Sequence, residues 1–440
     1  EDAWQRIPSH VADQLADVDV VVKFGMGLLR DPESIPSTYG VLSYHHGDPE
    51  TPRGRPAGFY ELGEGSPVMG IIVQQLTNTL DAGLILAKAY SRVDPTSYKA
   101  TFNNAATIGT PLLAQALETL RCTDALETTT VRPNRGLPPT RHVLRALLKM
   151  ATARMGRLFY GGFKEKRWNI AYMPGKFDPE STEVPHYDDL EPLELPEGYT
   201  FAADPCAHHN GRLYVEVMHA GTGKGEIFAY DDGTWLPVEV PVDGGHLSYP
   251  QIVEHNGATY LFPEMADVGP PSLFELDEDQ LTCGAVQPLV GLEDERLVDG
   301  TLLEHEGHWY LFGSRPETAN ERLDLWVADD LKGPWRPHPS SPVRLDPRSA
   351  RMGGPIVRAR GRMYRIGQNG SVGYGQGTTI NRIERLTPDT YREVSVSPFA
   401  IKGAFGPHTV LPNENGYWLD YYTEKTTPMA GVRRLRGLMN

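Results

Sequence analysis

Two histidines and an aspartate in the first hundred residues have the types and the spacing for acid–base chemistry. His45 and His46 follow a short apolar run at residues 41–44, and Asp81 comes 36 residues after His45. A neutral histidine can accept a proton near neutral pH, and a carboxylate beside it can hold its tautomer and stabilise the imidazolium. The hydroxyl of Ser43 could donate a hydrogen bond to a developing oxyanion. A structural hydrogen bond between His45 and Asp81 is the alternative interpretation.

This stretch resembles the catalytic core of the 10-formyltetrahydrofolate-dependent formyltransferases, over roughly residues 11–120. In that family a histidine at a strand end is followed eight and nine residues later by Arg-Gly and then by Leu-Asp-x-Gly; the matching residues here are Arg53, Gly54 and Asp81. Ser43 stands where the family has asparagine. The resemblance implies formyl transfer to an amine, with a catalytic set of Ser43, His45 and Asp81 and two auxiliary residues, His46 and Asp48. We expect Asp48 to keep His46 charged, because a nearby carboxylate favours the cation.

The resemblance also implies a donor and an acceptor. The donor would be 10-formyltetrahydrofolate, and the acceptor a small-molecule amine such as an amino sugar. We expect no metal. Because the family domain normally has further strand–helix units before this point, we also expect upstream residues that this sequence lacks. The residues that would hold the folate are Phe24, Gly25, Met26, Arg53, Gly54 and Thr77.

Composition limits the partners and the compartment. The chain has 440 residues and a formal net charge of −15, which argues against a nucleic-acid surface and against an anionic membrane surface. No apolar run approaches the ~18 residues that a membrane span needs. The three cysteines are far apart and form neither a metal-ligand pattern nor a disulfide framework, so we expect a reducing cytoplasm. A homo-oligomer stays open.

The order of the expected elements suggests an α/β domain at residues 1–127, a partial Rossmann-like formyltransferase domain. Strands are expected at residues 19–24 and 69–76, and the first of them is typical of a buried parallel sheet. Helical periodicity follows at residues 97–104 and 108–121.

Residues 128–165 are expected to be a linker and an amphipathic helix. Prolines open the segment, and Thr140 is in position to cap a basic amphipathic helix at residues 141–158. Such a helix is typical of a membrane surface or of packing between two domains, and we expect the second.

A repeat fills residues 166–440. Five turns, each followed by an aromatic-rich strand, have glycines spaced by 46, 50, 54 and 55 residues, namely Gly211, Gly257, Gly307, Gly361 and Gly416. Repeats of this length predict the blades of a five-bladed β-propeller. The segment 168–173 is expected to close the ring by pairing with the last blade.

The propeller half resembles the family 43 glycoside hydrolases. Asp204 is similar to their first-blade base and Asp299 to their third-blade aspartate, but Gly353 stands where the fourth-blade acid is required. Glu264 is the available substitute, and without that acid two-carboxylate cleavage has no proton donor.

A closer resemblance is to the N-terminal propeller of plant glucosamine inositolphosphorylceramide transferases. It is carried by Arg351-Met352-Gly353-Gly354, Tyr364-Arg365-Ile366-Gly367-Gln368-Asn369 and Gly406-Pro407-His408-Thr409. The resemblance implies a sugar-related surface. Hydrogen bonding at strand ends around the central channel is an equally good reading of the polar residues, and the predicted ligand-binding set is Asp204, Glu264, Asp299 and His408.

The sequence is therefore compatible with three functions. The preferred one is formyl transfer to an amine, with the propeller helping to bind the acceptor. The others are a formyltransferase-like binding protein without activity and a carbohydrate-active propeller enzyme.

Overall fold

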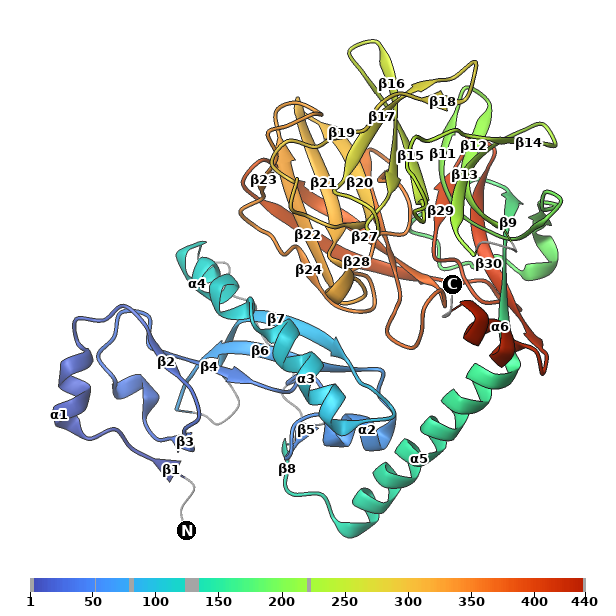
Figure 1. Ribbon diagram of the computed structural model, residues 1–440. Helices are drawn as coiled ribbons and strands as arrows, with labels where there is room; N and C mark the ends of the chain where they lie inside the picture. The colour runs from blue at the N-terminus through green and yellow to red at the C-terminus, as the bar shows by residue number, and fades with distance from the viewer. Residues whose placement is uncertain (1–3, 52, 79–82, 123–133, 220–222, 438–440) are drawn as a thin grey trace. The chain divides into compact units, whose positions relative to one another are not determined.

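The computed structural model describes residues 4–51, 53–78, 83–122, 134–219 and 223–437 (Figure 1). The chain divides into two compact units, residues 1–156 and 157–440. Helix α5 (Thr140–Phe163) runs across the division between them.

The first unit is built on a mixed four-stranded sheet in the order β2-β4-β6-β7. Its strands are β2 (Val21–Lys23), β4 (Val41–His45), β6 (Val68–Gln75) and β7 (Leu84–Arg92). Strand β2 pairs parallel with β4, but β6 is antiparallel to both β4 and β7. A short connection between β6 and β7 permits only an antiparallel pair, since a parallel pair needs a long crossover. The expected Rossmann-like domain is therefore not what the described residues form.

Helices cover this sheet and short elements complete the unit. Helices α3 (Tyr98–Gly109) and α4 (Leu112–Cys122) contact β6 and β7, and the side chain of Ser97 caps α3 by accepting from the Ala100 N–H. Strand β2 is at the sheet edge and half-buried, in contrast to the buried strand expected there. The short elements are β1 (Trp4–Gln5), α1 (Ser9–Ala12), β3 (Leu28–Leu29), β5 (Arg53–Gly54), α2 (Phe59–Glu64), β8 (Asn134–Arg135), and single 3₁₀ turns at Asp13–Leu15 and Pro32–Ser34.

The strands described in the second unit form five antiparallel sheets arranged as propeller blades (Figure 1). The first blade contains β11 (Tyr199–His209), β12 (Arg212–His219), β13 (Gly225–Asp231) and β14 (Thr234–Pro237). The second contains β15 (Ser248–His255), β16 (Ala258–Glu264), β17 (Ser272–Asp277), β18 (Thr282–Cys283) and β19 (Gln287–Pro288). The third contains β20 (Val298–His305), β21 (His308–Ser314), β22 (Arg322–Ala328), β23 (Arg336–Pro337) and β24 (Arg344–Leu345).

The fourth and fifth sheets complete the propeller. The fourth contains β25 (Val357–Ala359), β26 (Arg362–Gln368), β27 (Thr378–Leu386) and β28 (Tyr391–Phe399). The fifth combines both ends of the unit, in the order β10 (Glu191–Pro192), β9 (Lys164–Pro174), β30 (Gly416–Thr426) and β29 (Val410–Pro412). Strand β9 pairs with β30 from Lys164–Thr426 to Pro174–Gly416, so the ring closes where the sequence predicts.

The inner strands of three blades share a local distortion. Asp204, Tyr249 and Asp299 have φ values of 52, 48 and 49°, and the strand register shifts at each of them. A bulge of this kind turns a side chain out of the regular alternation. These three residues and His408 stand seven or eight positions before the turn glycine of their own repeats. The repeat thus brings one residue from several blades to the same end of the inner strands.

A short helix fixes the end of α5 in the second unit. Helix α6 (Ala430–Gly437) carries Arg434, whose guanidinium donates to the carbonyls of Tyr160, Gly161 and Lys164. Carbonyls at a helix C-terminus lack partners within the helix, and a cation there is favourable. Arg434 therefore caps α5.

Candidate functional site

The centre of the propeller holds a buried histidine between two aspartates. His408 Nε2 lies 3.1 Å from Asp204 Oδ1, and His408 Nδ1 lies 2.7 Å from Asp420 Oδ2. All three residues are buried. Asp420 also accepts the backbone N–H groups of His408, Thr409 and Asp204, and Asp204 accepts from the Thr409 hydroxyl at 2.8 Å. The cluster joins the first blade to the last.

The two carboxylates decide the charge of His408. Burial alone lowers a histidine pKa, but Asp420 and then Asp204 outweigh it and raise the pKa of His408 to about 10. The imidazole is therefore a cation at neutral pH. Among the described residues, Asp204, His408 and Asp420 are also the set whose spacing could hold a metal ion. Without a metal ion, His408 lies between the carboxylates with one of them beside each ring nitrogen.

A second buried ion pair lies across the third and fourth blades. The guanidinium of Arg351 donates to both oxygens of Asp299, and the Gln368 amide donates to Asp299 Oδ2 at 2.7 Å. The backbone N–H of Asp299 donates to Glu264 at 3.1 Å. Burial, and then the charge of Asp299, raises the pKa of Glu264 well above its ordinary value. Arg351 thus balances the charge of Asp299 inside the protein, and burial favours the neutral form of Glu264.

Glu216, on β12, is a second buried acid whose neutral form is favoured. Burial raises its pKa well above the ordinary value, the negative charge of Asp204 adds to this effect, and the positive charge of His408 opposes it. His246 Nδ1 accepts from the Gly225 N–H, so its proton is on Nε2, 3.4 Å from Glu216 Oε1. Burial lowers the pKa of His246.

Aromatic rings separate this buried network from solvent. The Trp168 ring lies 4.5 Å from the His408 ring and 4.8 Å from the Tyr422 ring, measured between centroids. Tyr374 lies 5.2 Å from the same histidine. Lys166 Nζ sits 4.1 Å from the centroid of Tyr422 and donates to the Tyr374 carbonyl at 2.7 Å. Cation and rings attract each other in this geometry.

Trp168 also lines a cavity of about 850 Å³ in the second unit. Aromatic side chains form much of its wall, namely Trp168, Tyr187, Tyr199, Phe201 and Tyr421. Lys166, Arg167 and Arg433 bring positive charge, of which Arg433 is paired with Glu165 at 2.8 Å. A volume of this size with aromatic walls and a few polar groups is typical of small-molecule sites.

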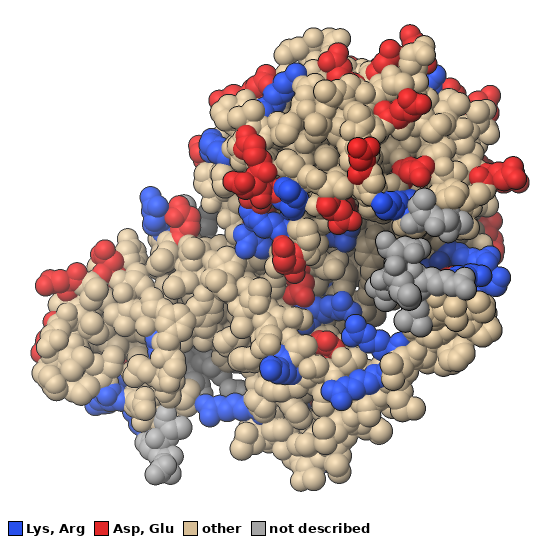
Figure 2. Space-filling view, viewed as in Figure 1, with Lys and Arg blue, Asp and Glu red and all other residues tan. Residues whose placement is uncertain are grey.

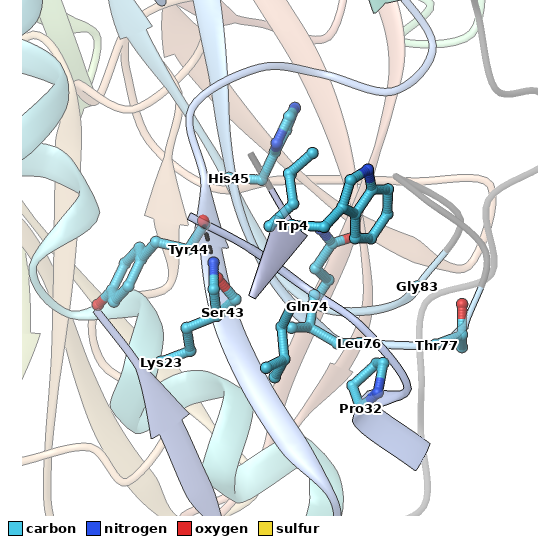
Figure 3. A pocket seen from close by; sticks show the side chains of 12 residues that line it. Trp4, Lys23, Pro32, Ser43, Tyr44, His45, Gln74, Leu76, Thr77 and Gly83 are labelled. Atoms are coloured by element: carbon cyan, nitrogen blue, oxygen red, sulfur yellow. Dashed lines mark hydrogen bonds between the residues drawn. The ribbon is translucent and has the colours of Figure 1, made fainter. Parts of the chain in front are cut away.

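The first unit has a smaller cavity, of about 100 Å³, at the end of β4 (Figure 3). Ser43, His45 and Thr77, all three predicted site residues, line it together with Lys23. Lys23 and Ser43 are direct neighbours on β2 and β4, and Figure 3 shows their side chains next to each other. The Ser43 hydroxyl donates to the Tyr44 carbonyl at 3.3 Å. Asp81 lies outside the described residues, so its pairing with His45 stays a prediction.

The two expected auxiliary residues do not pair with each other. His46 lies between the rings of Tyr44 and Phe102, at centroid distances of 6.5 and 5.7 Å, and burial lowers its pKa. Asp48 instead accepts from Lys88 at 3.0 Å and from Tyr90 at 2.8 Å. Burial opposes the charge of Asp48, but these bonds and one from the Glu50 N–H outweigh it and lower its pKa. The expectation that Asp48 keeps His46 charged was wrong.

The residues expected to hold the folate are spread out. Phe24 and Met26 are exposed, and Phe24 packs against Tyr44 at 5.6 Å. Gly25 has a φ of 65°, and no atom lies within 4 Å of the position that a Cβ would occupy. Gly54 lies in β5 against the Tyr60 ring, and the backbone of Arg53 pairs with β8.

The propeller predictions came closer to a real cluster. Asp204, Glu264, Asp299 and His408 all lie in the central network, as the charge effects on Glu216 show. Sequence reasoning missed a second group, which consists of Trp168, Glu216, Arg351, Gln368, Tyr374 and Asp420. A signal existed for four of them. Arg351 and Gln368 stand in the motifs that carry the resemblance to the plant transferases. Glu216 and Asp420 are single acidic residues inside apolar strands, at Tyr214-Val215-Glu216-Val217 and Trp418-Leu419-Asp420-Tyr421.

Comparison with known proteins identifies relatives of the second unit. Residues 197–406 match the family model described as glucosamine inositolphosphorylceramide transferase 1, N-terminal. The protein named glucosamine inositolphosphorylceramide transferase 1 from Arabidopsis thaliana is 32% identical over 218 residues, which cover 46% of this chain and 28% of that protein. The protein of the same name from Oryza sativa subsp. japonica is 30% identical over 211 residues, with shares of 45% and 28%. The match thus spans little more than a quarter of these relatives.

Solved structures give a weaker likeness. An exo-β-1,3-galactanase from Clostridium thermocellum is 13% identical with a TM-score of 0.35, covering 52% of this chain and 59% of that one. A thermostable family 43 glycoside hydrolase is 13% identical with a TM-score of 0.30, covering 54% and 81%. We draw no functional conclusion from likenesses at this level.

These findings correct the expected activity. The family model and the curated relatives are named for glucosamine inositolphosphorylceramide transferases and not for formyltransferases, so the assignment as a formyltransferase was wrong. The error came from a few motif residues at the right spacing in a sheet with a different strand arrangement. The folate donor expected with that activity stays an untested prediction.

Proposed function

We propose that the propeller is a carbohydrate-binding domain whose ligand, a sugar carrying a negative charge, occupies the cavity beside Trp168. The observation that carries the proposal is that aromatic side chains form much of the wall of this cavity. Aromatic rings offer flat apolar faces, which pack against the C–H faces of sugar rings, while nearby polar groups fix orientation. The buried aspartates and His408 are engaged with each other, so their role is to hold Trp168 and the inner strands in place.

Charge narrows the ligand class. Lys166 and Arg167 add positive charge to the wall, and the third cation, Arg433, is balanced by Glu165. A phosphate or carboxylate on the sugar would pair with the two remaining cations. The name of the curated relatives combines an amino sugar with a phosphorylated inositol lipid, which supports a ligand of this chemistry.

The proposal is tested by titrating glucosamine, glucuronic acid and inositol 1-phosphate into the full chain, followed by calorimetry. We expect the two anionic compounds to bind more tightly than glucosamine. Tyr187→Ala should lower the affinity for each ligand about tenfold, which corresponds to the loss of one ring contact. Arg167→Gln should weaken only the anionic ligands.

A matched control is Arg385→Gln, because Arg385 is an exposed arginine on the fourth blade and does not line the cavity. This variant should bind like the unchanged protein. Binding that is the same in Tyr187→Ala and Arg167→Gln as in the control would place the ligand elsewhere. No binding of any of the three compounds would reject a charged sugar as the ligand class.

A further inference from the structure

Helix α5 carries a stripe of exposed apolar side chains. The stripe follows positions i, i+3, i+4, i+11, i+14 and i+15, so its members lie on one side of the helix. Each is between 52 and 77% exposed. They are Leu144, Leu147, Leu148, Met155, Leu158 and Phe159. Scattered apolar residues on a surface need no explanation, but a continuous stripe along one helix does.

The opposite side of α5 packs, in its N-terminal part, on the first unit. Ala146 is fully buried, and a Cβ on Gly63 of α2 would lie 3.7 Å from it. The His142 ring lies 5.1 Å from the Tyr60 ring, and Arg154 donates to the Thr96 carbonyl at 2.9 Å. The helix therefore turns its smallest and most polar side inward and its leucines outward, the reverse of an ordinary surface helix.

The charge of α5 is the reverse of that of the whole chain. Its 24 residues include five Lys or Arg and no Asp or Glu, whereas the chain has a net charge of −15. On the face drawn in Figure 2 the surface of α5 is largely uncharged and is bordered by Lys and Arg. Arg141 and Arg145 are exposed beside the apolar stripe. An uncharged apolar stripe flanked by cations complements the headgroup region of an anionic bilayer.

We propose that α5 docks the protein on an anionic lipid bilayer, lying in the plane of the membrane surface with its leucines among the acyl chains. None of the helices in the described part of the chain is long and apolar enough to cross a membrane. A helix of 24 residues is about 36 Å long, long enough for its apolar side chains to contact lipid along several turns. The overall negative charge argues against such a surface, but this helix is a local exception to it.

The proposal is tested with the full chain and sedimented vesicles of phosphatidylcholine, with or without about 30% phosphatidylserine. These vesicles contain no sugar, so their binding is independent of the carbohydrate proposal. The unchanged protein should sediment with the anionic vesicles and much less with the neutral ones. The double variant Leu144→Glu/Leu148→Glu should lose at least about tenfold in affinity, and Arg141→Gln/Arg145→Gln should lose anionic selectivity.

The matched control places the same acidic residues at exposed apolar positions of the propeller, in Val286→Glu/Val290→Glu, and should bind like the unchanged protein. Circular dichroism and thermal denaturation check that every variant is folded. Equal sedimentation of Leu144→Glu/Leu148→Glu and the control would overturn the proposal, as would a failure of the unchanged protein to bind anionic vesicles. A dimer in solution that the same double variant dissolves, with no vesicle binding, would assign the stripe to a second copy instead.

Discussion

At the scale of single residues, the channel of the propeller is governed by how buried charges are balanced. His408 is a cation because Asp204 lies beside its Nε2 and Asp420 beside its Nδ1. Removing one partner of such a buried pair costs much more than an exposed pair is worth, since the other charge is left without compensation. We therefore expect the three residues to stabilise the contact between the first and last blades.

His408→Gln should lower the free energy of unfolding by about 3–5 kcal/mol at pH 6. The pKa of His408 is about 10 in the folded protein, above its ordinary value of 6.5, so its stabilisation is complete below about pH 6.5 and is lost as the pH rises towards 10. The difference between variant and unchanged protein should therefore shrink as the pH rises. Urea denaturation at several pH values measures it, with the exposed His10→Gln as control. A difference that is constant with pH would show that the histidine is neutral.

Glu216 should behave in the opposite sense. Its folded pKa is raised above the ordinary value of 4.5, so the unchanged protein loses stability as the pH rises above about 4.5, when only the unfolded chain ionises. Glu216→Gln is nearly isosteric and removes this titration. We expect the stability of the variant to match that of the unchanged protein near pH 4.5 and to exceed it increasingly as the pH rises to 7. Lower stability of the variant at pH 7 would mean that Glu216 is ionised in the folded state.

At the scale of elements, a glycine-rich loop at residues 370–377 closes over the aromatic wall. Gly375 has a φ of 73°, and a Cβ there would overlap the Trp168 ring. Gly211, in the turn of the first blade, has a φ of 83° but open space around it. Gly211→Ala should cost about 1 kcal/mol for the backbone conformation alone. Gly375→Ala should cost about 1–3 kcal/mol more and change the near-ultraviolet circular dichroism of tryptophan, because the ring must move. Equal costs would show that the loop does not press on Trp168.

The structure of the fourth blade leads to a second prediction at this scale: the propeller should not hydrolyse glycosides. The acid of a two-carboxylate mechanism would have to stand at Gly353, where a Cβ would lie 2.7 Å from the His408 carbonyl oxygen. Asp299 is neutralised by Arg351, and Glu264 accepts from the Asp299 backbone. Aryl glycosides should release no product. Release that disappears in Asp299→Ala would contradict this.

The five-fold repeat could be predicted from the sequence because each turn and the strands beside it are formed by residues close together in the chain. Asn210 and Gly211 have the left-handed φ values that an Asn-Gly hairpin turn requires, and their recurrence predicts blade length and ring closure. Asp204 was found through the resemblance to the family 43 glycoside hydrolases, and His408 through the motif shared with the plant transferases. Arg351 and Gln368 were missed because their partner, Asp299, is brought to them only by the ring. In the first unit the strands at residues 41–45 and 68–75 were located, but the direction in which they pair was not, since periodicity carries no information about partners.

At the scale of the whole molecule, two units with separate cores share one continuous helix. The core of the first unit contains Ile72 on β6, and that of the second contains Ile170 on β9; both side chains are fully buried. Ile170 lies in the strand that closes the ring, opposite Asp420 of β30. Because each core belongs to one unit, the two units should unfold as separate cooperative transitions in calorimetry.

Two substitutions test this independence, and each serves as the control for the other. Replacing a buried isoleucine by alanine costs about 2–5 kcal/mol, and each kcal/mol lowers the melting temperature of a unit of this size by about 2–4 °C. Ile170→Ala should lower one transition by several degrees and leave the other in place, and Ile72→Ala should do the reverse. The transition that Ile170→Ala shifts should be the larger in enthalpy, because unfolding enthalpy grows with the number of residues and the propeller is the longer unit. A single transition lowered by both variants would mean that α5 couples the two units into one cooperative structure.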